Sequence, residues 1–144
     1  MELRLPPRIK VLEALGAVVD GRVRLVGEGR CEVVSSEGDR TYTVVVEGGF
    51  AYSDDNGTVY RGYAGYPIVA CLMAGGRLPV DAELGEKLRG VPWRRLNELY
   101  RRYEDVLRHI YRERGVDRER AEAYIAEVLR RLGAMRLRFK PPGG

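Results

Sequence analysis

The chain has 144 residues, of which 44% are hydrophobic, and it carries a formal net charge of +4. This length predicts one compact domain with an ordinary globular core. No run is long and apolar enough to span a membrane, and the first ten residues lack a signal-peptide core. We therefore expect a soluble cytoplasmic protein that does not bind membranes.

The charge is unevenly distributed. Residues 1–60 hold seven basic and ten acidic side chains, a balance of −3, whereas residues 61–144 hold eighteen and eleven, a balance of +7. This asymmetry suggests an anionic partner for the second half, and nucleic acid is the commonest. A surface covered with ion pairs would explain the same charge distribution equally well. The chain has no Gln and only two Asn, and this depletion of heat-labile amides indicates a thermophilic source.

The first part of the chain predicts a short helix followed by a β-meander. Arg8–Ala17 has the apolar spacing of an amphipathic helix. Three β-rich runs follow, at residues 22–25, 30–36 and 40–47. In the last run, alternation places Tyr42, Val44 and Val46 on one face, and an antiparallel sheet usually packs one face on helices.

The dipeptide Asn56-Gly57 predicts a tight type I′ hairpin, because both residues tolerate a positive φ. The two strands of this hairpin would be Phe50–Asp55 and Thr58–Tyr63. They complete a predicted meander of about four strands packed on helices, which is an α+β fold. In the expected register, four side chains share one face of the hairpin: Phe50, Tyr52, Arg61 and Tyr63.

Two helices are predicted next. Tyr66-Pro67 opens a short helix that Gly75-Gly76 ends, and its apolar residues on nearly every side predict burial. After a connector, Val91 to about Arg114 has the longest helical pattern, with one buried stripe. One face of this helix would carry a row of basic residues: Arg94, Arg95, Arg101, Arg102 and Arg108.

The C-terminal part predicts a separate helical element. Asp117 is a good N-cap, and Ala121–Leu132 is amphipathic but too short for a stable coiled coil by itself. This helix would either pair with the preceding helix or with its copy in a second chain. Residues 135–140 predict a short edge strand or arm, and residues 141–144 should be disordered. We therefore expect an α+β nucleic-acid-binding domain at 1–114 and a C-terminal oligomerisation segment at 115–144.

Cys31 and Cys71 stand alone, without a CxxC motif. Two free, buried thiols are the favoured interpretation for a reducing compartment. The alternative is a disulfide between them, as found in intracellular proteins of hyperthermophiles.

The sequence gives little support for a catalytic or metal-binding site. The only His is His109, in the middle of a predicted helix, and no Cys lies at ligand spacing from it. The pair Asp54-Asp55 lies next to the predicted turn, where acidic residues commonly make local hydrogen bonds. We therefore predict no enzyme activity, no metal site and no cofactor.

Aromatic and basic residues are the more informative set, because unpaired bases stack on exposed rings while Arg holds phosphates. The alternative is that strand aromatics form cross-strand pairs and helix aromatics form core. Core is favoured for Phe50, Tyr100 and Tyr103, and packing is slightly favoured for Trp93. The candidate nucleic-acid-binding residues are Tyr52, Arg61, Tyr63, Tyr66, Trp93, Arg94, Arg95, Arg101 and Arg102.

Three strings in the chain resemble the ThermoDBP family and its related proteins: VVSSEGDRTYTVVV, YSDDNGTVYRGYAGYPIVACLMAGGRLP and GVPWRRLNELYRRYEDV. The resemblance covers roughly residues 9–106. It implies a single-stranded DNA-binding protein of hyperthermophilic archaea, with an α+β core and a cleft of apolar and basic side chains. It also implies little sequence preference, and oligomers formed through C-terminal helices in the manner of a short zipper.

These observations lead to one main expectation and one alternative. We expect a non-sequence-specific single-stranded DNA-binding protein, acting by base stacking and Arg–phosphate contacts as a homodimer or higher homo-oligomer. The alternative is a protein-interaction or scaffold module that assembles through its C-terminal helices.

Overall fold

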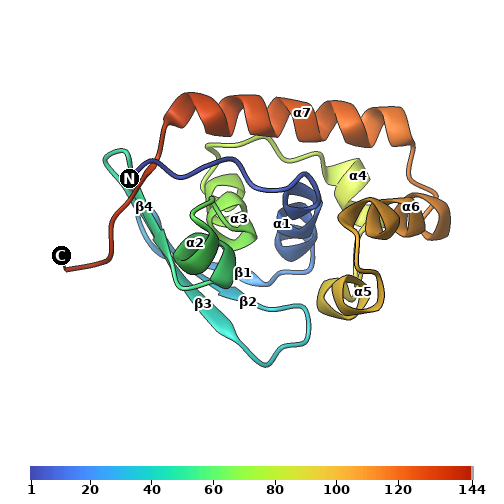
Figure 1. Ribbon diagram of the computed structural model, residues 1–144, viewed down its shortest axis with the longest axis horizontal. Helices are drawn as coiled ribbons and strands as arrows, with labels where there is room; N and C mark the ends of the chain where they lie inside the picture. Colours follow the sequence, from blue (N-terminus) through green and yellow to red (C-terminus); the bar gives the residue numbers. More distant parts are fainter. Residues whose placement is uncertain (144) are drawn as a thin grey trace.

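The computed structural model describes residues 1–143, which form an α+β fold of five strands and seven helices. Figure 1 shows the layers: the sheet lies on one side, helix α7 runs along the other, and α1 and α3 lie between them. The predicted α+β class and the predicted C-terminal helix are confirmed. None of the helices within residues 1–143 has both the length and the apolar character needed to cross a membrane.

The sheet has the strand order β1-β2-β3-β4-β5. Its first four strands form an antiparallel meander, which confirms the predicted arrangement, although the predicted strand Thr58–Tyr63 is not one of them. Strand β5 joins β4 in parallel. The last strand lies within the stretch predicted to be a short edge strand. The strand bounds are β1 Val23–Gly27, β2 Arg30–Val34, β3 Thr41–Glu47, β4 Phe50–Ser53 and β5 Arg138–Phe139.

One face of the sheet packs against α1 (Ile9–Val19) and α3 (Tyr66–Ala74). Val44 and Val46 lie on this face and are buried, while Tyr42 is partly buried against the same core, so the predicted alternation along β3 is confirmed. Seven of the nine residues of α3 are buried. A helix that is apolar on all sides needs neighbours on all sides, and α3 has the sheet on one side and α1 on another.

The predicted hairpin at Asn56-Gly57 is wrong. These residues begin helix α2 (Asn56–Arg61), and the turn between β3 and β4 lies at Gly48-Gly49, where φ is +56° and +83°. The helix forms here because Asp55, the preceding residue, caps it. The Asp55 carboxylate accepts hydrogen bonds from the Thr58 backbone N at 3.1 Å and from the Thr58 hydroxyl at 2.8 Å. Such a cap pairs a free helix N–H and stabilises the first turn.

Without this hairpin, the side chains expected to share one of its faces lie on different elements. Tyr52 lies on β4 opposite Val45. Arg61 ends α2, and Gly62 then reverses the chain with a φ of +72°. Tyr63 follows in an isolated bridge to Arg4. The two strands predicted from the Asn-Gly turn therefore do not pair.

The predicted long helix is broken into α5 (Trp93–Leu99) and α6 (Tyr103–Glu113). Tyr100 and Arg102 have extended backbones at the break. The break lets the chain fold back, so that the Tyr100 hydroxyl lies 3.0 Å from Nδ1 of His109. The predicted row of arginines along one helix face therefore does not exist. A further short helix, α4 (Ala82–Lys87), precedes α5.

Helix α7 (Arg118–Met135) is part of the same core as the rest of the chain. Asp117 caps it, as predicted, by accepting a hydrogen bond from Glu119 N at 3.0 Å. The chain ends are tied together by backbone bonds, including Leu3 N to Leu137 O at 2.8 Å. The apolar residues expected to meet a second chain are buried against this chain's own core: Ala121, Tyr124, Ile125, Val128 and Leu132.

Residues 115–140 are therefore packed with the first 114 residues rather than set apart from them. Of the tail predicted to be disordered, residues 141–143 are exposed, and Gly144 lies outside the described residues.

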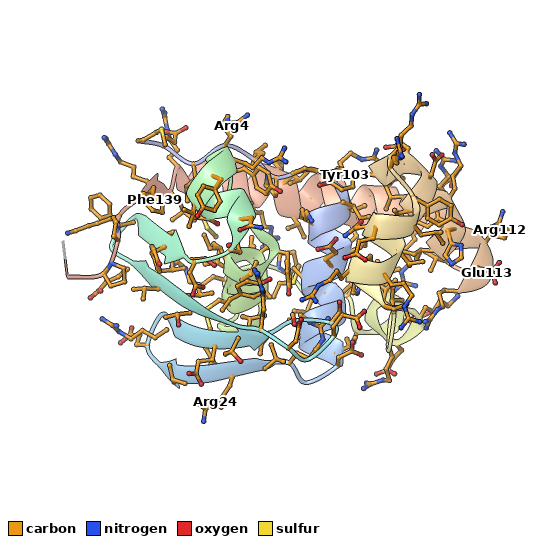
Figure 2. All side chains as sticks on the ribbon, turned by 60° about the horizontal axis from the view of Figure 1, so that its bottom comes forward. Arg4, Arg24, Tyr103, Arg112, Glu113 and Phe139 are labelled. Carbon is orange, nitrogen blue, oxygen red and sulfur yellow. A yellow bond between two sulfur atoms is a disulfide. The ribbon has the colours of Figure 1, made fainter. Side chains whose placement is uncertain are left out.

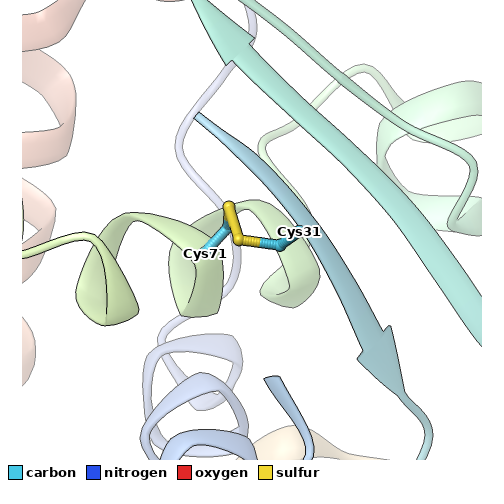
Figure 3. Close-up of a disulfide and its surroundings, with 2 residues drawn as sticks. All are labelled: Cys31 and Cys71. Atoms are coloured by element: carbon cyan, nitrogen blue, oxygen red, sulfur yellow. A yellow bond between two sulfur atoms is a disulfide. The ribbon is translucent and has the colours of Figure 1, made fainter. Parts of the chain in front are cut away.

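Cys31 on β2 and Cys71 on α3 form a disulfide, with their Cα atoms 5.8 Å apart (Figure 3). The favoured prediction of two free thiols is wrong, although both side chains are buried as expected. The physical reason is direct packing of α3 on β2, which brings the two residues into the range that a disulfide spans.

Candidate nucleic-acid interface

Two pockets adjoin each other on one side of the molecule. The tryptophan pocket has a volume of about 230 Å³ and is lined by Lys10, Glu13, Arg22, Ser35, Ser36, Tyr42, Tyr66, Trp93, Arg94, Asn97 and Glu98. The tyrosine pocket has a volume of about 240 Å³ and is lined by Lys10, Tyr42, Asp55, Asn56, Gly57, Arg61, Tyr63, Tyr66 and Tyr103. Because Lys10, Tyr42 and Tyr66 line both, the two pockets are neighbours, and we call the two together the groove.

Two tyrosines form the boundary between the pockets. The rings of Tyr42 and Tyr66 meet edge to face, with centroids 6.0 Å apart and planes at 85°. Tyr66 is the first residue of α3, directly after Gly65. A Cβ at Gly65 would lie 2.0 Å from the Asp55 carboxylate, so only glycine allows the caps of α2 and α3 to meet here. Burial raises the pKa of Tyr66 above its usual range, so its hydroxyl stays protonated.

A buried ion pair lies beneath this boundary. Lys10 Nζ lies 3.3 and 3.4 Å from the two Glu13 carboxylate oxygens, and the Glu13 side chain is 4% exposed. Burial lowers the pKa of Lys10 and is the largest single effect, but Glu13, Tyr103 and Tyr63 together outweigh it, so the pKa of Lys10 is raised. The same ammonium lies 5.3 Å from the centre of the Tyr103 ring. Lys10 therefore stays charged where the two pockets join.

Three buried side-chain atoms within residues 1–143 have no hydrogen-bond partner: Arg22 Nη2, Trp93 Nε1 and Asn97 Oδ1. All three residues line the tryptophan pocket. An unpaired buried polar group costs roughly 1–3 kcal/mol, and most such groups in folded proteins have a partner. These unpaired groups therefore gather in the wall of one pocket.

Five of the nine predicted site residues line the groove: Arg61, Tyr63, Tyr66, Trp93 and Arg94. Trp93 is 3% exposed, and its indole packs so closely on α1 that a Cβ at Gly16 would lie 2.8 Å from Nε1. Trp93 is therefore part of the pocket wall and not an exposed stacking surface.

Arg94 is tied to a neighbouring carboxylate. Its two terminal nitrogens donate to the Asp39 oxygens at 2.7 and 2.6 Å. These hydrogen bonds hold the pKa of Asp39 well below its usual range. Arg94 thus lies at the groove but is already paired.

The other four predicted residues lie outside both pockets. The Tyr52 ring packs beside Phe139, with centroids 5.9 Å apart, and Figure 2 shows Phe139 well separated from Tyr103. The prediction that Tyr52 joins Arg61 at a binding face is therefore wrong, because it depended on the hairpin register.

Arg95, Arg101 and Arg102 are exposed, and the last two lie in the break directly before Tyr103, which lines the tyrosine pocket. Within residues 1–143, Arg61, Arg95, Arg101 and Arg102 form no ion pair with a carboxylate. We call Arg61, Arg101 and Arg102 the rim arginines.

Sequence reasoning missed several groove residues. Tyr103 was expected in the core, but it is 43% exposed and lines the tyrosine pocket; Figure 2 shows it beside α1. Lys10 and Arg22 were not singled out, because they are far from the aromatic hairpin in sequence. Tyr42 was predicted on one face of its strand but was not among the candidate site residues. Asn97 carried a usable signal, since it is one of only two Asn in a chain without Gln.

The residues considered for catalysis make local contacts. Asp54 accepts a hydrogen bond from Thr43 N at 2.9 Å, and Asp55 caps α2. Among residues 1–143, no three His, Cys, Asp or Glu side chains come together in a way that would hold a metal ion.

Comparison with known proteins gives a family and no named relative. No curated protein and no solved structure matches the chain. A family model described as "Uncharacterised conserved protein UCP014422" matches residues 3–138. Because this match spans nearly the whole chain, the protein belongs to that family.

Proposed function

We propose that this protein binds single-stranded DNA along the groove. The observation that carries the proposal is the combination of five aromatic side chains and four basic ones in the two adjoining pockets. Stacking surfaces for bases and cations for phosphates are the two components of single-strand binding.

The tyrosine pocket supplies accessible rings. Tyr103 is 43% exposed, and Tyr63 is partly buried at the same pocket. Stacking of one base on one such ring contributes about 1–3 kcal/mol. A duplex keeps its base faces stacked inside the double helix, so this contribution favours single strands.

The rim arginines supply phosphate contacts. Because they have no carboxylate partner within residues 1–143, they approach phosphates without first breaking an ion pair. The resemblance of residues 9–106 to the ThermoDBP family supports the same function. Assembly through α7 is not part of the proposal, because its apolar face is buried in this chain's own core.

A salt titration tests the proposal. Fluorescence anisotropy would measure binding of a labelled single strand and of the matching duplex from low to high salt. We expect tighter binding of the single strand, with a log–log slope of about −0.7 for each phosphate contacted. Equal affinity for the duplex, or no binding at low salt, would contradict the proposal.

A further inference from the structure

The sheet has one face that no helix of residues 1–143 covers. Helices α1 and α3 pack on the face that carries Val44 and Val46. Figure 1 shows α1, α2 and α3 on that side of the sheet and no helix on the other. Side chains alternate along a strand, so Val45 points to the uncovered side, and the strand register places Arg30 and Tyr52 beside it. We call this surface the open face; it includes Arg30, Val45, Phe50, Tyr52, Arg138 and Lys140.

A hollow of about 450 Å³ lies on the open face. It is larger than either pocket of the groove, whose volumes are about 230 and 240 Å³. Val45 and Phe50 form apolar parts of its wall, and Arg30 and Lys140 contribute positive charge. The hollow therefore combines the two kinds of side chain that also line the groove.

Two aromatic rings lie on the open face of β4. Phe50 and Tyr52 are two positions apart and point to the same side, because Ala51 between them is buried in the core. Phe50 is 40% exposed, and Tyr52 is half-buried with its ring centroid 5.9 Å from that of Phe139. Exposed rings on a sheet are surfaces on which unpaired bases stack.

Two unpaired cations lie next to these rings. Lys140 Nζ is 5.1 Å from the centre of the Phe50 ring, and Arg138 is opposite Phe50 in the register of β4 and β5. Neither cation forms an ion pair with a carboxylate of residues 1–143. Arg30 is 3.8 Å from Glu47, and both side chains are exposed, so this pair is weak. The open face thus holds cations directly beside its rings.

The combination decides which kind of partner fits. An acidic peptide would match the cations but would leave the rings of Phe50 and Tyr52 without a planar partner. An apolar peptide would leave Arg138 and Lys140 facing an uncharged surface. A single-stranded nucleic acid supplies phosphates for the cations and base faces for the rings, whereas a duplex keeps its base faces stacked inside.

We propose that the open face is a second surface that binds single-stranded DNA. Bases stack on Phe50 and Tyr52, while Arg138 and Lys140 bind phosphates. The groove lies on the other side of the sheet, since its residues Lys10 and Tyr66 belong to α1 and α3. One chain therefore holds two separate segments of single strand at the same time.

This inference goes beyond the proposed function, which concerns the groove alone, and it depends on a different set of residues. The open face has two cations without a carboxylate partner in residues 1–143, and the groove has three rim arginines. We therefore expect the open face to bind a strand less tightly than the groove does.

Calorimetric titration at a high concentration of the full chain tests the proposal. The titrant is a dT strand of about eight nucleotides, within the site sizes of roughly 4–16 nucleotides known for other single-strand-binding folds. We expect two strands per chain, bound in a tight and a weaker step. Phe50→Ala with Lys140→Ala should weaken the second step by at least about tenfold and leave the first step unchanged. Arg61→Ala with Arg102→Ala should weaken the first step alone.

A matched control removes one exposed ring and one exposed cation elsewhere. Tyr60→Ala with Arg112→Ala changes residues that line neither the groove nor the hollow. Figure 2 shows Arg112 at the opposite end of the molecule from Phe139. This variant should keep both binding steps, and all variants should keep the melting temperature of the wild type, because the substituted side chains are exposed.

Two single substitutions test whether stacking is the contact. Phe50→Trp should retain the second step, whereas Phe50→Leu, which keeps an apolar side chain without a ring, should weaken it by about tenfold. Equal affinities in these two variants would refute stacking at the open face.

The outcomes separate this inference from the proposed function. One strand per chain, lost only when the rim arginines are replaced, refutes the second surface and leaves the groove standing. One strand per chain, lost only when Phe50 and Lys140 are replaced, refutes binding in the groove and leaves the open face standing. If no strand binds at low salt, both proposals fail.

Discussion

The groove rim and helix α7 both carry many arginines, but those arginines differ in what they contact. On α7, three of the four arginines pair with carboxylates: Arg120 donates to Asp81 at 2.9 Å, and both Arg130 and Arg131 pair with Glu127. The fourth, Arg118, lies over the Tyr111 ring. The rim arginines have no carboxylate partner within residues 1–143. Two regions with the same residue type thus differ in the charge they leave available.

This difference shows why the balance of +7 in residues 61–144 does not by itself locate a binding site. An arginine already paired with a carboxylate gives a phosphate little additional attraction, because the pair must first separate. The expected consequence is that α7 contributes ion pairs to the surface while the rim binds DNA. Five predictions test this comparison, in order of decreasing effect.

The largest expected effect is on the stability of the fold, and it comes from removing the disulfide. The disulfide joins β2 to α3, which carries Tyr66 into the groove, across a sequence separation of 40 residues. Removing it with Cys31→Ala and Cys71→Ala should lower the free energy of unfolding by about 4 kcal/mol, from the larger entropy of the open unfolded chain.

Denaturant unfolding would be followed by Trp93 fluorescence for the groove and by far-UV circular dichroism for the helices. Coincident transitions are expected, because α7 and the groove share one core. Two separate transitions would show that α7 is an independent unit. Reductant should destabilise the wild type and leave the double variant unchanged.

The next effect compares the arginines directly. Arg61→Ala with Arg102→Ala should weaken single-strand binding by about a hundredfold, since each hydrogen bond to a charged group contributes roughly 1.5–3 kcal/mol. The log–log salt slope should fall in magnitude by about 1.4 for the two lost contacts.

The matched control removes the same charge from α7. Arg130→Ala with Arg131→Ala should change neither the salt slope nor the affinity by more than about twofold, because both arginines are paired with Glu127. Equal losses in the two double variants would mean that only overall charge matters.

A tyrosine substitution tests stacking at the rim. Tyr103→Ala should weaken binding by about tenfold, within the roughly 1–3 kcal/mol of one base–aromatic contact, while Tyr103→Phe should retain it. Tyr60→Ala is a control for exposure, since Tyr60 is 81% exposed yet lines neither pocket. An equal loss in Tyr60→Ala would place the bound strand outside the tyrosine pocket.

A smaller gain is expected from releasing a paired arginine into the groove. Asp39→Asn removes the partner of Arg94 and a negative charge beside the tryptophan pocket. Affinity for single strands should rise about threefold, since an exposed ion pair contributes roughly 0.2–1 kcal/mol, and the salt slope should become steeper by about 0.7. An unchanged slope would show that Arg94 does not reach a phosphate even when it is free.

The smallest effect is on the pH dependence of stability. Hydrogen bonds from Arg130 and Arg131 lower the pKa of Glu127 from 4.5 to about 2. A lowered folded-state pKa means that this stabilisation is present above pH 4.5 and is lost as the pH falls towards 2. Melting temperatures of the wild type and Glu127→Gln should therefore differ slightly at pH 7 and converge at low pH. A difference that persists at pH 2 would have another cause.

Most elements were predictable from local sequence. The Tyr66-Pro67 start and the Gly75-Gly76 end of α3, the alternation along β3 and the cap at Asp117 all depend on residues a few positions apart. The failures occurred where two local signals competed. Asn56-Gly57 favours a turn, but Asp55 and Thr58 form a helix cap at the same place, and Gly48-Gly49 makes the turn instead.

The sequence by itself determined the α+β class, the meander and the burial of α3, because hydrophobic periodicity and turn chemistry act within single elements. Only the tertiary structure decided the disulfide, the break between α5 and α6 and the groove. The groove joins residues from Lys10 to Tyr103, and no spacing in the sequence shows that they meet. The same packing decided which arginines stay unpaired, since Asp39 reaches Arg94 across 55 residues while the rim arginines meet no carboxylate within residues 1–143.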